Sequence, residues 1–354
     1  MNATTTLSDD QIRRLPKAEL HVHVEGAVVP ATIADIARRN GVDLGLPPGV
    51  DDPAALYRYD GLDDFLRVFD VICRSLQTTD DLHRVTYEAL GIAAAAGVRY
   101  REMFFSPTFL MRHGVAFSTI WNGIATGIGD ARTDHGIDCK MILDVHKPAG
   151  PTAAGELVEL ATSCDRELLI GIGGDGGEHG VDLPALAGPF AEARRRGFHT
   201  TIHVGEEGPV DDLRTAVREL GVRRIDHGFP LLDDPDLTSE VIDRRIALTC
   251  CPTSNMEIGL IDHIADHPII ALRDAGVLVT VNSDNAEMFG VDVADELCSL
   301  RDAFDLDAEA IVDLCLAGLD AAWLDDTERR GWRAEFERNG LRDHASTVTT
   351  PDGE

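Results

Sequence analysis

The sequence lacks any long apolar run, since no stretch approaches the roughly 20 residues that a membrane-spanning helix requires. Residues 1–10 are polar and acidic, so they carry none of the basic and apolar regions of a secretory signal peptide. The seven cysteines are odd in number, scattered and never spaced as CxxC, which argues against a disulfide framework or a structural zinc ribbon. These absences predict a soluble cytoplasmic protein with free thiols.

Basic residues are also scarce. The chain has 32 Lys and Arg against 62 Asp and Glu, a formal net charge of −30. Such a charge repels the phosphates of nucleic acids and of anionic lipids. We therefore expect neither a nucleic acid nor a membrane as partner, whereas the charge does not indicate the substrate and the oligomeric state stays open.

No Pro- or Ser-rich linker and no repeat of solenoid length divides the 354 residues. We therefore expect a single domain over residues 1–354, with residues 1–12 flexible and residues 340–354 a loose tail.

Short apolar runs recur along the chain, and each run ends in a polar or glycine-containing cluster before a helical pattern begins. Eight strands that alternate with helices predict an α/β protein, a closed (β/α)8 barrel of the TIM type. The predicted strands are Ala18–Val24, Val98–Phe105, Cys139–Val145, Leu168–Gly173, Thr200–Val204, Arg224–His227, Ala247–Cys251 and Val277–Asn282. The predicted helices include Ala31–Asn40, Leu82–Ala96, Ser118–Gly136, Leu183–Arg196 and Asp211–Leu220.

The stretch Gly41–Phe69, after the first predicted strand, is too long for a plain crossover. Its apolar Leu62, Phe65, Leu66 and Phe69 predict extra helices. These helices either lie over the barrel mouth or pack on the barrel wall, and the pattern alone does not decide between the two.

Polar residues gather at the C-terminal ends of the predicted strands, where barrel enzymes place their active sites. Positions two apart on a strand face the same side, so His21 and His23 both point into the barrel and form a chelating pair suited to zinc. Three more strands end in residues that bind metals or protons, namely His203 and Glu206, Asp226 and His227, and Asp284 with Asn285. Three His and one Asp at one rim predict a metal site with one position left for water.

A single metal is predicted rather than two. Binuclear barrel hydrolases usually need a bridging carboxylate, often a modified lysine, at the end of the third or fourth strand. The fourth predicted strand ends in Gly173-Gly174-Asp175 without a lysine, and only Lys147, just after the third strand, is near.

From Leu15 to Phe289 the chain resembles the adenosine and adenine deaminases of the amidohydrolase superfamily. The stretch LPKAELHVHVEG at residues 15–26 is similar to the opening signature of that family almost residue for residue. HVGEEGP at residues 203–209 resembles its HAGE motif, and RIDHG at residues 224–228 resembles its RIGHG segment. CPTSN at residues 251–255 and VNSDN at residues 281–285 correspond to two further blocks.

The resemblance implies one zinc ion per chain, which activates a water molecule. The implied metal ligands are His21, His23, His203 and Asp284. It also implies that Glu206 donates a proton to N1 of a purine, that His227 orients the attacking water, and that Asp284 accepts a hydrogen bond from it.

Four residues are implied in substrate binding: His23, Glu25, Gly174 and Asn285. Gly174 would offer its N–H to ring N3, and Glu25 would hold the remainder of the substrate. Asn285 stands where the family commonly has a second Asp that contacts N7; its amide still donates but carries no charge.

The chain departs from the family pattern at other positions too. Ala286 replaces the usual proline, Gly176 stands where the strand-four motif usually has Glu, and Asp226 replaces the glycine of RIGHG, a variant associated with adenine-type members. These departures bear on the substrate more than on the reaction.

The sequence therefore predicts a zinc-dependent hydrolytic deaminase of a 6-aminopurine nucleoside, which releases ammonia and forms the 6-oxo product. Adenine itself, or a modified nucleoside such as aminodeoxyfutalosine, is the alternative substrate. A barrel amidase or lactonase is less favoured because Glu206 and Gly174 suit a ring-nitrogen acceptor. An inactive binding homologue is also less favoured, because every predicted ligand and Glu206 are present.

Overall fold

The computed structural model describes residues 6–46, 49–59 and 61–338. The expected tail at residues 340–354 lies outside this part of the chain. The strands are β1 Lys17–Glu19, β2 Val98–Phe105, β3 Asp138–His146, β4 Leu169–Asp175, β5 His199–Thr200, β6 His203–Val204, β7 Arg224–His227, β8 Ala247–Cys250 and β9 Val279–Val281.

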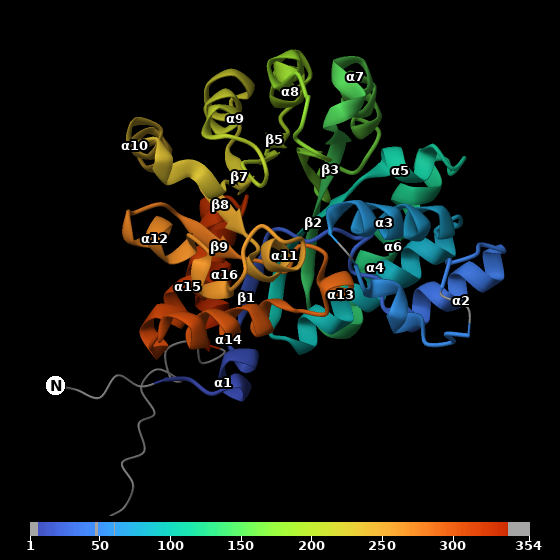
Figure 1. The fold of residues 1–354 in the computed structure, drawn as a ribbon, viewed down its shortest axis with the longest axis horizontal. Coiled ribbons are helices and arrows are strands. Elements are labelled where there is room, and N and C mark those ends of the chain that lie inside the picture. Colours follow the sequence, from blue (N-terminus) through green and yellow to red (C-terminus); the bar gives the residue numbers. More distant parts are fainter. Residues whose placement is uncertain (1–5, 47–48, 60, 339–354) are drawn as a thin grey trace, which may run out of the picture.

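Helices alternate with these strands. They are α1 Asp9–Arg14, α2 Pro30–Asn40, α3 Leu62–Ser75, α4 Thr79–Ala95, α5 Pro107–Met111, α6 Phe117–His135, α7 Gly150–Ala161, α8 Ala187–Arg195, α9 Val210–Thr215, α10 Pro235–Asp243, α11 Pro252–Glu257, α12 Ile269–Asp274, α13 Ala286–Phe289, α14 Val293–Phe304, α15 Ala308–Ala321 and α16 Asp326–Arg338. Figure 1 shows α7, α8, α9 and α10 in an arc outside the strands.

The strands form two parallel sheets, in the orders β1-β2-β3-β4-β5 and β6-β7-β8-β9. The fifth predicted strand is divided between them, because the backbone of Thr201 donates to Ile172 on β4 while Ile202 accepts from Asp226 on β7. On the other side, Val22 forms a parallel bridge with Asp284 and joins the first strand position to the last. The two sheets thus close into the predicted barrel.

The first strand is shorter than predicted. Its regular pairing ends at Glu19, since the N–H of Leu20 donates to the side-chain oxygen of Asn282 at 2.8 Å. Pairing with β2 resumes at His23, which forms a bridge with Phe104. This irregular stretch is the one that carries both predicted histidine ligands.

Local sequence signals account for the helix ends. Gly41 and Gly136 end α2 and α6, and Gly221 ends the π-helical segment Ala216–Leu220 that follows α9. All three adopt left-handed conformations, with φ of 68°, 66° and 65°, which is the geometry that a glycine C-cap supplies. Thr78 and Asp81 form a capping box at the start of α4. These signals place the helices close to the predicted ranges.

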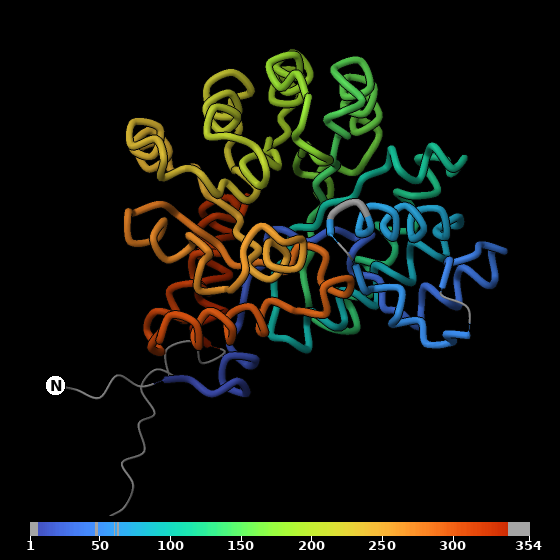
Figure 2. The backbone as a smooth tube through the Cα atoms, viewed as in Figure 1, coloured from blue at the N-terminus to red at the C-terminus, as the bar shows by residue number. Residues whose placement is uncertain are grey.

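The N-terminal segment packs against helices from the C-terminal part of the chain. In Figure 2 the blue N-terminal segment runs beside the red C-terminal helices, and α1 packs against α14 while α15 packs against β1. Leu7 and Ile12 are buried in this contact, so residues 9–12, expected to be flexible, lie instead in a packed helix.

The insertion after the first strand position forms α3, which lies over the barrel mouth. Phe65 of α3 stacks on Phe289 of α13, with ring centroids 5.2 Å apart, and Phe69 contacts Phe109 of α5 edge to face. Of the two expected positions for the insertion, the structure shows the one over the mouth. No helix in the described ranges is long and apolar enough to cross a membrane.

Candidate active site

Four side chains from three strand ends bring their ligand atoms together at the closing seam of the barrel. The Nε2 atom of His203 lies 3.0 Å from Nε2 of His21 and 3.2 Å from Nε2 of His23. Oδ1 of Asp284 lies 3.4 Å and 3.3 Å from the same two atoms of His21 and His23. Ligands about 2.0–2.1 Å from a tetrahedral zinc ion are about 3.3 Å from one another, so this spacing fits such an ion.

The hydrogen bonds of the Nδ1 atoms of His203 and His21 place the ring hydrogen on Nδ1. The Nε2 atom of each neutral ring therefore carries a lone pair. Nδ1 of His203 donates to the carbonyl of Gly174 at 2.9 Å. Nδ1 of His21 donates to the Thr249 hydroxyl, which in turn donates to Asp226. Two Nε2 lone pairs 3.0 Å apart repel each other unless a cation lies between them. The donor set therefore fits a bound metal.

Asp226 supports this arrangement through hydrogen bonds from two threonines. Its two oxygens accept hydrogen bonds from the hydroxyls of Thr201 and Thr249 at 2.7 and 2.8 Å, and the side chain is fully buried. Burial opposes its negative charge, but the neighbouring His203, His21 and Arg224 lower the pKa of Asp226. The Asp in place of the family glycine thus fixes the orientation of His21 through Thr249.

His227 and Asp284 adopt left-handed backbone conformations, with φ of 71° and 58°. Such conformations are uncommon for residues other than glycine and cluster at functional sites. Nε2 of His227 lies 3.5 Å from Oε1 of Glu206. Burial favours the neutral ring, yet Glu206 and Asp284 outweigh it and raise the pKa of His227.

Glu206 lies on the wall of the pocket, with 22% of its side chain exposed. Removal of water by the pocket walls raises the pKa of Glu206 to about 7. His227 opposes this shift, and the carboxylates of Asp284 and Glu178 add to it. A carboxyl group with such a pKa is suited to hold a proton at neutral pH and to donate it.

Sequence reasoning missed Glu178. Its carboxylate accepts hydrogen bonds from three consecutive backbone N–H groups, those of Gly205, Glu206 and Glu207, at 2.8, 2.9 and 3.1 Å. Gly208 leaves room for it, since a Cβ at that position would overlap Oε2 of Glu178. A lone Glu in a loop offers no pattern that would have singled it out.

Lys147, the lysine that directly follows β3, contacts the backbone of a predicted metal ligand. Its side chain is buried, and its Nζ donates to the backbone carbonyl of His203. The lysine thus supports the backbone of β6 at His203.

Two residues predicted to contact the substrate, Gly174 and Glu25, are not among the residues that line the pocket. Gly174 is buried on β4, where its carbonyl accepts from His203; Gly176 and Gly177 line the pocket instead. Glu25 is buried, and its Oε1 accepts from the backbone N–H of Ser106 at 2.8 Å. The pocket wall described here does not include either residue.

Asn285 does line the pocket, beside the predicted metal ligands. Its Nδ2 donates to Oδ1 of Asp284 at 2.9 Å, and its Oδ1 is buried without a hydrogen-bond partner. Ser254 donates to the other oxygen of Asp284 at 2.5 Å. Gly26 makes room for Asn285, since a Cβ there would overlap its amide.

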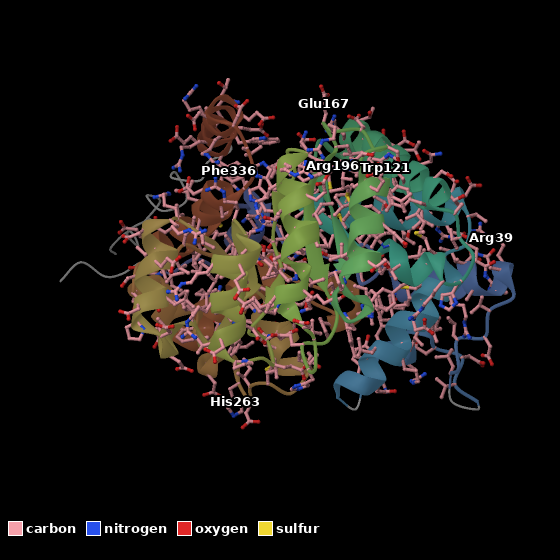
Figure 3. All side chains as sticks on the ribbon, turned by 90° about the horizontal axis from the view of Figure 1, so that it is seen from above. Arg39, Trp121, Glu167, Arg196, His263 and Phe336 are labelled. Carbon is pink, nitrogen blue, oxygen red and sulfur yellow. The ribbon has the colours of Figure 1, made fainter. Side chains whose placement is uncertain are left out.

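The pocket joins this polar floor to an apolar mouth. His23, His203, His227, Asp284 and Glu206 line the floor. The mouth is lined by Phe65, Leu66, Phe69, Phe109, Ile258 and Phe289. Figure 3 labels Glu167 and Arg196 at the end where the barrel strands begin and His263 at the opposite end, on the side of the mouth. A flat apolar ring with polar edges suits such a pocket.

Comparison with known proteins agrees with this geometry. The adenosine deaminase family model matches residues 16–338. The adenine deaminase of Rhodopseudomonas palustris is 38% identical over 322 residues, which covers 90% of this chain and 92% of that protein. The adenine deaminase of Streptomyces coelicolor is 35% identical, with coverage of 93% and 96%.

Solved structures are similar as well. The crystal structure of adenine deaminase from Arthrobacter aurescens aligns with a TM-score of 0.84 at 29% identity, over 94% of this chain and 98% of that one. An amidohydrolase from Burkholderia ambifaria with bound Zn aligns with a TM-score of 0.87 at 30% identity, over 98% and 97%. The chain belongs to the adenosine deaminase family and is a hydrolytic deaminase that acts on C–N bonds.

Proposed function

We propose that this protein is a zinc-dependent adenine deaminase. The reaction adds water to C6 of adenine and releases the 6-amino group as ammonia, so that adenine and water give hypoxanthine and ammonia. The relatives named adenine deaminase favour the free base, which the sequence allowed as an alternative, over the nucleoside that it predicted first.

The position of Glu25 is the observation that carries this choice. The family resemblance assigns this residue to the part of the substrate beyond the base. Here its carboxylate is buried against the N–H of Ser106 and is absent from the pocket wall. Without that contact, the pocket lacks the side chain that the resemblance assigns to the part of the substrate beyond the base.

His21, His23, His203 and Asp284 would hold the metal, because their inner ligand atoms are spaced 3.0–3.4 Å apart. When bound, the zinc ion supplies the Lewis-acid chemistry that makes water a nucleophile near neutral pH. The Zn-bound Burkholderia ambifaria amidohydrolase supports the identity of the metal.

Glu206 would act as the general acid. Because its pKa is raised to about 7, the carboxyl group holds a proton that it donates to N1 of the ring, which makes C6 electrophilic. His227, 3.5 Å from Glu206, would orient the attacking water, and Asp284 would accept a hydrogen bond from it. Asn285 lies at the pocket wall where the ring edge would be held.

The test is a substrate panel of adenine, adenosine and a 5′-modified adenine nucleoside, with ammonia and the 6-oxo product measured for each. We expect kcat/KM for adenine to exceed that for both nucleosides. Glu206→Gln should keep its metal and lose about 10²–10⁴-fold in kcat. A higher kcat/KM for adenosine than for adenine would overturn the proposed substrate, and turnover by Glu206→Gln close to wild type would overturn the proposed acid.

A further inference from the structure

Asn255 lies beside Glu206 but has no part in the mechanism above. It belongs to α11, its side chain is fully buried, and its Nδ2 lies 3.2 Å from Oε1 of Glu206. On its other side, Oδ1 of Asn255 lies 3.3 Å from Nε2 of the buried His267. Nδ1 of His267 lies 3.0 Å from the backbone nitrogen of Ile269.

The direction of these hydrogen bonds follows from their fixed end. Ile269 begins α12, so its N–H has no acceptor within the helix and can only donate to Nδ1 of His267. Burial lowers the pKa of His267 to about 3, so the neutral ring has one N–H, and it must be on Nε2. Nε2 therefore donates to the oxygen of Asn255, which leaves the Asn255 NH₂ group to face Glu206.

This direction has a consequence for the proton of Glu206. A neutral carboxyl group has one O–H, and its carbonyl oxygen is the better acceptor. Because the Asn255 amide donates to Oε1, the protonated form with its hydrogen on Oε2 is favoured. Nε2 of His227 also faces Oε1, at 3.5 Å. Oε2 is then the oxygen that presents a proton to the ring.

We propose that His267 and Asn255 are positioning residues that act in series to place the proton of Glu206 on Oε2. The inference rests on the proposed role of Glu206 as the acid. His267 is not among the pocket-lining residues, and the hydrogen bonds of its ring run to Asn255 and to the backbone of Ile269, so its proposed effect on Glu206 passes through Asn255. Its ring packs edge-on against Phe229, with centroids 4.8 Å apart, so a purely apolar role for His267 is the competing explanation.

The substitutions separate these two roles. Asn255→Asp keeps the size of the side chain but replaces the donor facing Glu206 with an acceptor. His267→Leu keeps the apolar contact with Phe229 and removes the donor to Asn255, whereas His267→Gln keeps an N–H near the position of Nε2. His263→Leu is the matched control, because His263 is an exposed histidine four residues earlier (Figure 3).

The readouts are kcat, KM and metal content, with whichever aminopurine the wild type turns over fastest. We expect Asn255→Asp to lower kcat by about 100-fold or more, with KM within about threefold and the metal retained. His267→Leu should lower kcat by about tenfold, His267→Gln should recover most of it, and His263→Leu should match the wild type. A kcat for Asn255→Asp within threefold of wild type, or equal losses in His267→Leu and His267→Gln, would overturn the proposal.

A second measurement does not depend on turnover. Nitrogen NMR of protein labelled at histidine, with the His267 signals assigned from their loss in His267→Gln, reports which ring nitrogen carries the hydrogen. The proposal requires Nε2–H, and an Nδ1–H or doubly protonated His267 would contradict it. If the wild type deaminates no aminopurine, the proposed function fails while this measurement still decides the direction of the hydrogen bonds.

Discussion

The carboxylate of Glu178 lies against the backbone that carries Glu206. It accepts from the N–H groups of Gly205, Glu206 and Glu207, so one side chain from the loop after β4 fixes three residues after β6. Consecutive N–H groups that point to one place form a nest for an anion, and Glu178 fills it. The geometry of the predicted acid thus depends on a second acidic residue that lies behind it.

We predict that Glu178→Gln lowers kcat by about 10- to 100-fold. A Gln side chain has one acceptor oxygen and an NH₂ group, so at least one of the three N–H groups would face a donor. A hydrogen bond to a charged acceptor contributes about 1.5–3 kcal/mol, which corresponds to this range. Steady-state kinetics of the purified variant, together with metal analysis, would check it.

The matched control is Glu167→Gln, an exposed Glu at the far end of the barrel (Figure 3). It should behave as the wild type. Loss of metal in Glu178→Gln, or a change in KM alone, would show that Glu178 does not act through Glu206.

We also expect close to one equivalent of tightly bound divalent metal per chain. His203→Ala removes the Nε2 atom that lies 3.0 and 3.2 Å from those of His21 and His23, so metal and activity should be lost together. Elemental analysis measures the metal in the wild type and the variant, and ammonia release measures their activity. Two equivalents in the wild type would contradict the mononuclear site.

The stability of the protein should depend on the ionisation of Glu296. This side chain is fully buried; Oε1 accepts from the N–H of Thr253, and Oε2 has no partner. Burial raises the pKa of Glu296 from 4.5 to about 8, and the nearby Glu19 and Asp284 add to the shift. Between these pH values the folded state binds more protons at Glu296 than the unfolded state does. Ionisation of Glu296 therefore costs no stability below pH 4.5, and it lowers the free energy of unfolding progressively as the pH rises to about 8.

Glu296→Gln removes this ionisation. We predict that the Tm of the variant minus the Tm of the wild type increases steadily between pH 5 and pH 8. Thermal unfolding at several pH values measures the difference, and the exposed Glu309→Gln serves as control. A Tm difference that does not vary with pH would show that Glu296 is already ionised in the folded protein.

The sequence predicted the strand positions well where apolar runs were unbroken. β2 and β7 begin and end at the predicted residues. The first strand is shorter than predicted because the N–H of Leu20 donates to the side chain of Asn282. Asn282 is distant in sequence, so the local pattern around Leu20 could not indicate this hydrogen bond. Likewise, the division of the fifth strand depends on bonds from Thr201 and Ile202 to two different neighbours.

The clustering of His21, His23, His203 and Asp284 was predictable, because side-chain chemistry and strand alternation act together at these positions. The site was not predictable in the run Gly173-Gly174-Asp175-Gly176-Gly177. A glycine-rich run has almost no side chains to indicate which backbone groups face the pocket, and the structure places Gly176 and Gly177 there rather than Gly174. The role of Glu178 depends on hydrogen bonds to a loop far along the chain.

The last prediction concerns Asn285 and the choice between adenine and its nucleosides. One N–H of its amide donates to Asp284, which leaves a second N–H and an unpartnered oxygen. A side chain with both a donor and an acceptor can face N7 of free adenine whether or not that nitrogen carries the ring hydrogen. In a nucleoside N9 is substituted, so N7 only accepts, and a protonated Asp would serve it equally well.

We therefore predict that Asn285→Asp raises kcat/KM for adenosine relative to adenine by about three- to tenfold, the effect of one neutral hydrogen bond of about 0.5–1.5 kcal/mol. The Asp would lie against Asp284, where the Asn285 amide is now 2.9 Å away, and this proximity favours its protonated, donating form. The measurement is kcat/KM for adenine, adenosine and a 5′-modified nucleoside in wild type and variant, with the exposed Asn122→Asp as control. If kcat/KM changes by the same factor for all three substrates, position 285 does not contact the base. The selectivity must then come from Phe65, Leu66 and Phe69 of α3 at the pocket mouth.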